Sequence, residues 1–238
     1  MAYQSVFKRY ELKYMLTRAQ QERLLQAMQS YMALDRYGRD TIRNVYFDTE
    51  NYRLIRSSLE RPVYKEKLRL RSYRQAEPDS PVYVELKKKY QGVVYKRRVC
   101  MPSQQASAWL LDGGSREESQ IAREIDYFRQ YYAGLRPVVF LSYEREAFYS
   151  RDGTDFRVTF DDHILCRRED LSLESPVWGT ELLEPGKVLM EIKTSGGIPM
   201  WMTEVLSRER IYKTSFSKYG TAYRTLIYQK SKGDFSYA

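Results

Sequence analysis

Four cations occupy every second position of the segment VYKEKLRLRSY, residues 63–73. They are Lys65, Lys67, Arg69 and Arg71. Because a β-strand points successive side chains to opposite faces, all four would share one face of a strand. Like charges side by side repel one another, so this arrangement needs either open water or an anion beside it. Unless this face is open to water, the segment therefore indicates a surface that binds a polyanionic ligand.

The same alternation occurs in seven other segments, which are rich in Val, Tyr, Phe and Ile and are typical of β-strands. They are residues 5–16, 42–48, 81–90, 92–101, 138–150, 156–165 and 187–194. In several of them one face is apolar and the other carries charges of both signs. The charged faces hold Arg9, Glu11, Lys13, Glu85, Lys87, Lys89, Lys96, Arg98, Arg145, Arg157, Asp161, Glu191 and Lys193.

Helices are predicted between some of these strands. Thr17 and Gln20 have the spacing of a capping box and begin a helix that extends to about residue 32. An apolar stripe within residues 118–137, a short segment opened by Pro199, and residues 217–228 predict three more helices. The intervening segment MPSQQASAWLLDGGSREES, residues 101–119, reads as a loop-like insertion. No linker or repeat divides the chain, so we expect one domain over residues 1–238.

Composition limits the kind of site that the chain can form. Two cysteines, Cys100 and Cys166, have no metal-ligand spacing, and the only histidine, His163, cannot supply a histidine-based metal cluster. The chain lacks an apolar run of 18 or more residues, and its first residues lack the pattern of a signal peptide. We therefore expect a cytoplasmic protein with no transmembrane segment. Its net charge of +9 is compatible with nucleic acid, an anionic membrane or a phosphorylated ligand.

Two folds explain strands with one charged and one apolar face. In the first, each charged face is the solvated side of an ordinary antiparallel sheet. In the second, the strands close into a barrel with a polar interior, and amphipathic helices cover its apolar outside. The repetition of the pattern favours the second, an α+β fold with an eight-stranded antiparallel β-barrel. Inward Lys and Arg would bind phosphate oxygens, and inward carboxylates would hold a divalent cation.

The ordered motifs of the chain resemble the VTC domain, the polyphosphate polymerase module of the vacuolar transporter chaperone complex. The motifs are ELKY, YFD, KLRLRSY, YVELKKKYQGVVYKRR, YEREAF, FRVTFD, LMEIK and SFSKYG, over about residues 7–228. The domain is one of the triphosphate tunnel metalloenzymes, which include the CYTH domains and the fungal RNA triphosphatases. The resemblance implies a tunnel that binds a triphosphate with Mn²⁺ or Mg²⁺ and transfers the γ-phosphoryl group of ATP to a growing inorganic polyphosphate chain.

The same resemblance implies roles for individual residues. Catalytic contacts to phosphates fall to Lys13, Arg69, Arg71, Lys87, Arg145, Arg157 and Lys218. Further substrate-binding positions are Arg9, Lys96, Arg98, Lys193, Lys213 and Ser217, and the metal ligands are Glu191 and Glu11. Two positions depart from the family pattern. Arg9 stands where hydrolytic tunnel enzymes have a first glutamate, and Ser215 stands where a lysine is expected, with Lys213 as its nearest substitute.

Three functions follow from this interpretation. The leading one is ATP-dependent polyphosphate synthesis, which needs positioning and charge stabilisation more than a protein nucleophile. Arg9 favours it, because one carboxylate fewer gives a weaker metal site and a more positive tunnel. The second is hydrolysis of inorganic triphosphate or nucleoside triphosphates. The third is a non-catalytic module that binds polyanions; we expect no specific binding of nucleic acid, because the tyrosines fall at core positions and no RNA-binding signature is present.

Overall fold

The computed structural model describes residues 10–91 and 93–228. Its framework is one antiparallel sheet, in which the strand order is β10-β1-β9-β7-β6-β2-β3-β4-β5 and β8 pairs with β7. The strands are β1 (Tyr10–Thr17), β2 (Met32–Asp48), β3 (Tyr64–Tyr73), β4 (Pro81–Tyr90), β5 (Val93–Pro102), β6 (Arg136–Ser150), β7 (Arg157–Arg167), β8 (Thr180–Glu181), β9 (Lys187–Thr194) and β10 (Lys213–Thr214). Each of the eight long strands contains most of one predicted strand, although β2 begins ten residues before the predicted segment 42–48, and the α+β class is confirmed.

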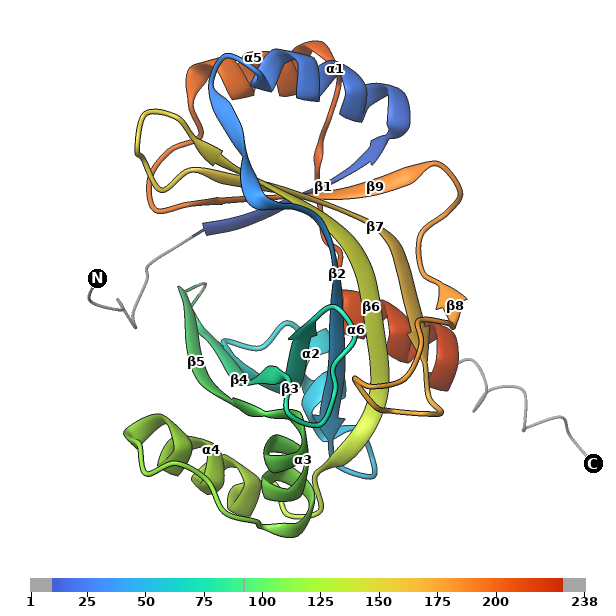
Figure 1. Cartoon of the computed structure of the whole chain (residues 1–238). Helices are drawn as coiled ribbons and strands as arrows, with labels where there is room; N and C mark the ends of the chain where they lie inside the picture. The colour runs from blue at the N-terminus through green and yellow to red at the C-terminus, as the bar shows by residue number, and fades with distance from the viewer. Residues whose placement is uncertain (1–9, 92, 229–238) are drawn as a thin grey trace, which may run out of the picture.

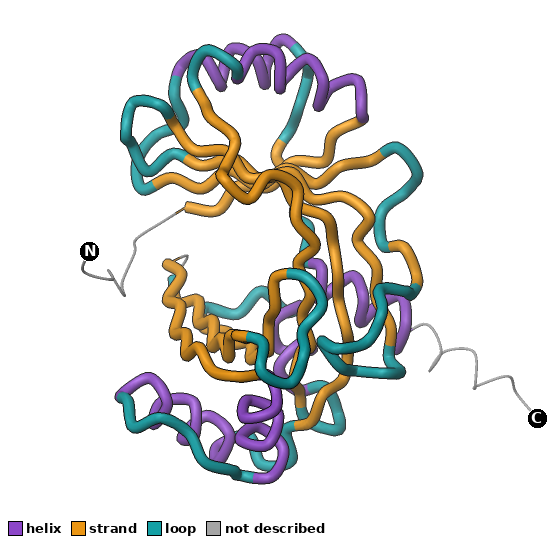
Figure 2. Tube along the Cα trace, viewed as in Figure 1, coloured by secondary structure: helices purple, strands orange, loops and turns teal. Residues whose placement is uncertain are grey.

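The predicted closure of the barrel is wrong. The sheet curls into an open C, in which β5 at one end and β10 and β1 at the other face each other across a gap (Figure 1, Figure 2). Within the described residues no backbone pairing joins these two edges. A side-chain contact bridges them instead, because Lys87 Nζ of β4 lies 2.8 Å from Glu11 Oε2 of β1. The polar concave side is therefore a trough with an ion pair across its opening.

Six α-helices flank this sheet within the described part of the chain. They are α1 (Arg18–Met28), α2 (Arg53–Leu59), α3 (Ser103–Asp112), α4 (Gln120–Tyr131), α5 (Met200–Arg208) and α6 (Lys218–Tyr223), which continues into a π-helical turn at Arg224–Tyr228. The capping box predicted at Thr17 is present, although α1 ends at Met28. The insertion predicted as a loop contains α3, and α2 was not predicted. Trp109, fully buried in the core, explains α3, because its indole needs an apolar contact surface.

The helices pack on both sides of the sheet. On the convex side, α1 and α5 bury Leu24 and Met202 against β1, β7 and β9, while α3 and α4 bury Trp109 and Ile125 against β3, β4 and β5. In contrast, α6 packs Tyr219 in a cluster with residues of β6 and β9 that lie on the same face of their strands as the side chains lining the cavity. This helix therefore closes part of the concave side, and it brings Lys218 to the interior.

Candidate phosphate-binding site

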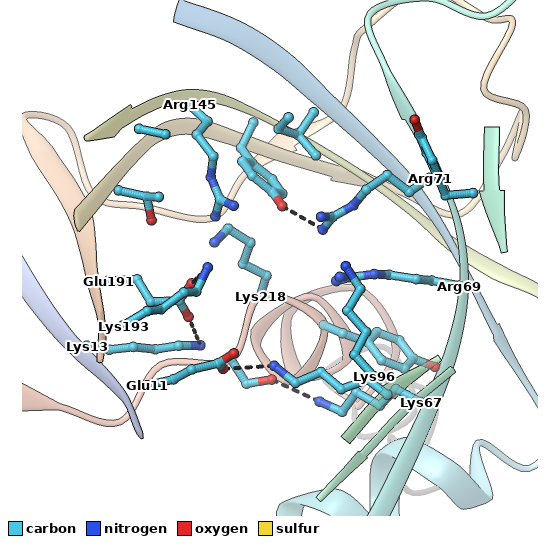
Figure 3. Close-up of a pocket in the computed structure, with 18 of the residues that line it drawn as sticks. Glu11, Lys13, Lys67, Arg69, Arg71, Lys96, Arg145, Glu191, Lys193 and Lys218 are labelled. Carbon is cyan, nitrogen blue, oxygen red and sulfur yellow. Dashed lines mark hydrogen bonds and ion pairs between the residues drawn. The ribbon is translucent and has the colours of Figure 1, made fainter. Parts of the chain in front are cut away.

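The concave side of the sheet encloses a cavity of about 1460 Å³. Every predicted site residue that the structure describes lines this cavity, although those residues are scattered over the chain from β1 to α6. They are Glu11, Lys13, Arg69, Arg71, Lys87, Lys96, Arg98, Arg145, Arg157, Glu191, Lys193, Lys213, Ser217 and Lys218. Arg9 lies outside the described residues. The fold thus gathers the candidates into one space (Figure 3), while their individual roles stay predictions.

One wall of the cavity is organised around Glu85, which is completely buried. Its carboxylate accepts hydrogen bonds from Arg69 Nε at 2.8 Å and Arg98 Nε at 2.7 Å, and Lys96 Nζ lies 2.6 Å away. Burial would raise the pKa of Glu85, but Arg71, Arg69 and the other two cations hold this pKa well below its ordinary value. A single anion therefore orders four cations and leaves this wall strongly positive.

Arg71 is the most enclosed cation of that wall, with 6% of its surface exposed. Its Nε donates to Asn44 Oδ1 at 2.8 Å, and its Nη2 donates to the hydroxyl of Tyr143 at 3.0 Å. The guanidinium is thus held on two sides by neutral partners, with the Glu85 carboxylate 3.8 Å away. Such fixed donors need no reorganisation when they meet an anion.

A second buried carboxylate, Asp161 of β7, orders the opposite wall. Arg145 Nε and Nη2 donate to its two oxygens at 2.6 and 2.7 Å, and Lys218 Nζ donates at 2.5 Å. Burial would raise the pKa of Asp161, but Arg145 and Lys218 lower it to about 2. The same two cations and Arg71 lower the pKa of the buried Tyr143 phenol to about 8 against the effect of burial. Tyr143 thus links the two walls, because its hydroxyl accepts from Arg71 and its ring lies beside Arg145 and Lys218.

Glu191 and Glu11 are the carboxylates that could hold a metal. They lie on the paired strands β9 and β1, where Glu191 is opposite Lys13 and Glu11 is opposite Lys193. Burial raises the pKa of both carboxyls, but neighbouring cations outweigh it and lower both pKa values. Glu191 has Lys193 Nζ at 3.0 Å and Lys13 Nζ at 3.7 Å. Both groups are therefore ionised and open to a cation.

These two carboxylates fit one kind of metal site. Within the described residues no group of three His, Cys, Asp or Glu side chains converges on a point. Mg²⁺ and similar hard ions, however, are commonly bound by one or two carboxylates together with substrate phosphates and water. The donor set of Glu191 and Glu11 suits a divalent ion that binds along with a phosphorylated ligand.

Lysines dominate the remaining part of the cavity. Lys67, Lys87 and Lys96 lie side by side on β3, β4 and β5. Burial, together with Lys87, Lys13 and Lys65, lowers the pKa of Lys67 to about 8 against the opposing effect of Tyr46. Burial and three neighbouring arginines lower the pKa of Lys96 to about 6 against the effect of Glu85. An arriving polyanion would relieve this repulsion and favour the charged forms of both lysines.

This environment predicts a pH dependence of ligand binding. Because Lys67 loses its proton as pH rises through about 8, we expect tripolyphosphate to bind several-fold more weakly at pH 9 than at pH 7. The terminal phosphates of the ligand, with pKa values near 6, are already ionised in this window. Isothermal titration calorimetry at constant ionic strength measures the trend. Lys67→Arg should make the trend shallower, because arginine stays charged throughout, while Tyr143, whose pKa is also about 8, still titrates; a slope as steep as that of the wild type in this variant contradicts the assignment.

Ser217 and Lys213 lie at the margin of the cavity. The Ser217 hydroxyl accepts a hydrogen bond from the Gly220 backbone amide at 3.2 Å, so it caps α6, and it also accepts one from Lys67 Nζ at 3.3 Å. Lys213 belongs to β10, pairs with Tyr14 and is exposed. Both Lys213 and Ser215 line the cavity, and the substitution of one for the other stays a prediction.

Sequence reasoning gave no role to Glu85, Asp161 or Tyr143. The two carboxylates were recognised as members of charged strand faces, but nothing in the alternation distinguishes a buried counter-ion from a solvated one. Tyr143 lies two residues before Arg145 and so on the same face of the strand. This spacing was the one signal that could have placed Tyr143 beside the site. Their importance comes from partners that are distant in the sequence.

Comparisons with known proteins agree with this geometry. The family model of the VTC domain matches residues 8–227. No curated protein matches the chain. Among solved structures, a candidate adenylate cyclase from Bacillus halodurans has a TM-score of 0.57 and 14% identity, covering 94% of this chain and 100% of that chain. A candidate adenylyl cyclase from Hippeastrum, described as having a dominant triphosphatase activity, has a TM-score of 0.52 and 15% identity, covering 90% and 95%.

At such identities the structural likeness shows a shared fold alone. The fold recurs in those proteins over nearly the whole chain. Within residues 10–91 and 93–228, each helix is too short or too polar to cross a bilayer.

Proposed function

Because the chain belongs to the VTC domain family, whose model matches residues 8–227, we propose that it is a metal-dependent polyphosphate polymerase that uses ATP. The observation that carries the proposal is the concentration of Lys and Arg from eight strands and α6 on one cavity, where buried carboxylates hold the central arginines in place. The family and the fold support a phosphoryl-handling enzyme of the triphosphate tunnel type with a divalent metal. The polymerase reaction, ATP, Mn²⁺ or Mg²⁺, and a cytoplasmic location belong to the proposal.

In the proposed reaction, a terminal phosphate oxygen of the polymer attacks the γ-phosphorus of ATP, and the bond from that phosphorus to the bridging oxygen of ADP breaks. Arg71 and Arg69 on one wall and Arg145 and Lys218 on the other would bind the phosphate oxygens and align them. A divalent ion held by Glu191 and Glu11 would neutralise charge on the triphosphate. Phosphoryl transfer depends mainly on such positioning and charge stabilisation.

The arrangement of lysines around the two carboxylates predicts coupled binding of metal and triphosphate. In the free protein Lys87 and Lys193 compete with a metal for Glu11 and Glu191. A triphosphate would attract those lysines and add oxygen ligands, so we expect Mn²⁺ to bind at least about 10-fold more tightly when tripolyphosphate is present. Electron paramagnetic resonance of free Mn²⁺, corrected for the Mn²⁺ bound by tripolyphosphate alone, measures this change. Equal Mn²⁺ affinity with and without the anion would contradict the arrangement.

The proposed function is tested directly by incubating the purified chain with ATP and Mn²⁺. The products are resolved on a polyacrylamide gel stained for polyphosphate, and phosphate release from tripolyphosphate is measured in parallel. A ladder of long polymer that a polyphosphatase removes is the expected result.

A triphosphatase is the second candidate, and one observation favours it. The Hippeastrum protein, which shares the fold, is described as having a dominant triphosphatase activity. The same walls would bind a triphosphate, with water in place of the polymer as the attacking group. Release of free phosphate without polymer in the gel experiment would establish this function instead.

A further inference from the structure

The end of the cavity beside α2 is lined by three cations that have no carboxylate partner. They are Arg61, which follows α2, Lys65 of β3 and Lys89 of β4. Within the described residues none of the three has an acidic oxygen within 4.0 Å. Lys65 Nζ donates a hydrogen bond to the backbone oxygen of Ser58 at 3.4 Å. Arg61 and Lys89 are exposed, so this end opens to water. We call these three residues the α2 rim.

The α2 rim differs from the two arginine walls and from Lys87 in how its charge is balanced. The central arginines share Glu85 and Asp161, and Lys87 is paired with Glu11. At the opposite end of β3, Arg74 Nε lies 3.2 Å from Asp40 Oδ1. On the α2 rim, Lys65 and Lys89 are direct cross-strand neighbours, which is a destabilising pair of like charges. Lys89 and Arg61 also help to lower the pKa of Lys65, after burial. The fold retains a repulsion that an anion would remove.

The rows of side chains across the sheet connect this rim to the centre. Arg69, Lys67 and Lys65 follow one another at every second residue on the concave face of β3. Four residues of strand separate Arg69 from Lys65, which is about 13 Å. Phosphates held between the two arginine walls therefore do not reach Lys65, and the lysine row of Lys67, Lys87 and Lys96 lies between the two places.

We propose that the α2 rim is an extended subsite for linear inorganic polyphosphate, which binds phosphates beyond those held by the arginine walls. The chain would lie along the lysine row and leave the cavity at this end. The inference rests on the proposed function, since it names the end of the same cavity at which the long polyanion lies. It assigns Arg61, Lys65 and Lys89 to retention of the polymer and not to the transfer step.

The surroundings favour a bare phosphate chain over a nucleic acid. Proteins that bind single strands combine cations with aromatic platforms on which bases stack. Beside the rim, the cavity is lined by Ser58, Leu59 and Val94. The nearest strand tyrosines, Tyr64 and Tyr90, have the opposite strand parity to Lys65 and Lys89 and contact each other, so they face away from the cavity.

The test is a triple variant, Arg61→Gln, Lys65→Gln and Lys89→Gln, studied without nucleotide or metal. Binding of long-chain polyphosphate, of tripolyphosphate and of a single-stranded oligonucleotide is measured by calorimetry at several salt concentrations. We expect affinity for the long chain to fall by about 10-fold or more and its salt dependence to become shallower, because fewer cations contact the polymer. Affinity for tripolyphosphate should change by less than about 2-fold, since the arginine walls are intact.

The matched control is Arg123→Gln, Arg136→Gln and Arg210→Gln, which removes the same charge from exposed positions outside the cavity. It should bind all three probes like the wild type. The proposal is overturned if the rim variant binds the long chain as the control does, or if it loses tripolyphosphate to the same extent. A larger loss for the oligonucleotide than for polyphosphate would assign the rim to nucleic acid. These binding measurements test the subsite separately from polymer synthesis. A protein that makes no polymer but binds polyphosphate through the rim would disprove the polymerase and leave the subsite intact.

Discussion

Replacement of Arg71 by alanine is expected to lower the rate of phosphoryl transfer by about 10²–10³-fold, whichever acceptor the enzyme uses. This is the usual effect of removing one preorganised donor to an anionic transition state. Arg71 is fixed by Asn44 and Tyr143, and it faces the cavity from the wall opposite Arg145. Removing it takes away a donor that the neighbouring Arg69 cannot replace, because Arg69 is bound to Glu85.

The measurement is the initial rate of polymer synthesis or phosphate release at saturating substrate, with circular dichroism to check the fold. Arg71→Lys should recover only part of the rate, since a lysine cannot contact Asn44, Tyr143 and a phosphate with one fixed group. Arg136→Ala, an exposed position outside the cavity, serves as the control and should keep the wild-type rate. A folded Arg71→Ala protein with the wild-type rate would refute the assignment of Arg71 to the reaction.

The second large effect concerns stability. Glu85→Ala should lower the free energy of unfolding by about 3–5 kcal/mol, because it leaves buried cations without their shared counter-ion. For a chain of this length each kcal/mol corresponds to about 2–4 °C, so the melting temperature should fall by about 10 °C. Tripolyphosphate should restore much of this loss, because its oxygens replace the missing carboxylate and the anion binds only the folded state.

Thermal unfolding with and without tripolyphosphate measures both parts of this prediction. Glu50→Ala is the matched control, since it removes one negative charge from a side chain that is 87% exposed, and surface changes of this kind alter stability by about 0.5 kcal/mol or less. If Glu85→Ala melts at the same temperature as Glu50→Ala, the carboxylate is not the organising anion of that wall. A destabilised variant that tripolyphosphate does not rescue would show that the arginines no longer bind phosphate.

The amino-acid sequence by itself determined the eight long strands and which residues share a face of each. Strand periodicity is local, since successive side chains alternate regardless of what the strand pairs with. For this reason Lys65, Lys67, Arg69 and Arg71 were placed on one face correctly, and the described candidates on predicted strands line the cavity. Lys213, Ser217 and Lys218, which also line it, came from the family resemblance. The capping box at the start of α1 is equally local and was also found.

Only the tertiary structure decided how the sheet closes and which charges meet. The ion pair across the gap joins Glu11 to Lys87, which are 76 residues apart, and the contact of Lys218 with Asp161 spans 57 residues. Such partners depend on the register of several strands and on the position of α6, none of which the alternation fixes. The buried carboxylates that order the cations, and the rim that lacks one, therefore became visible only when distant strands came together around the cavity.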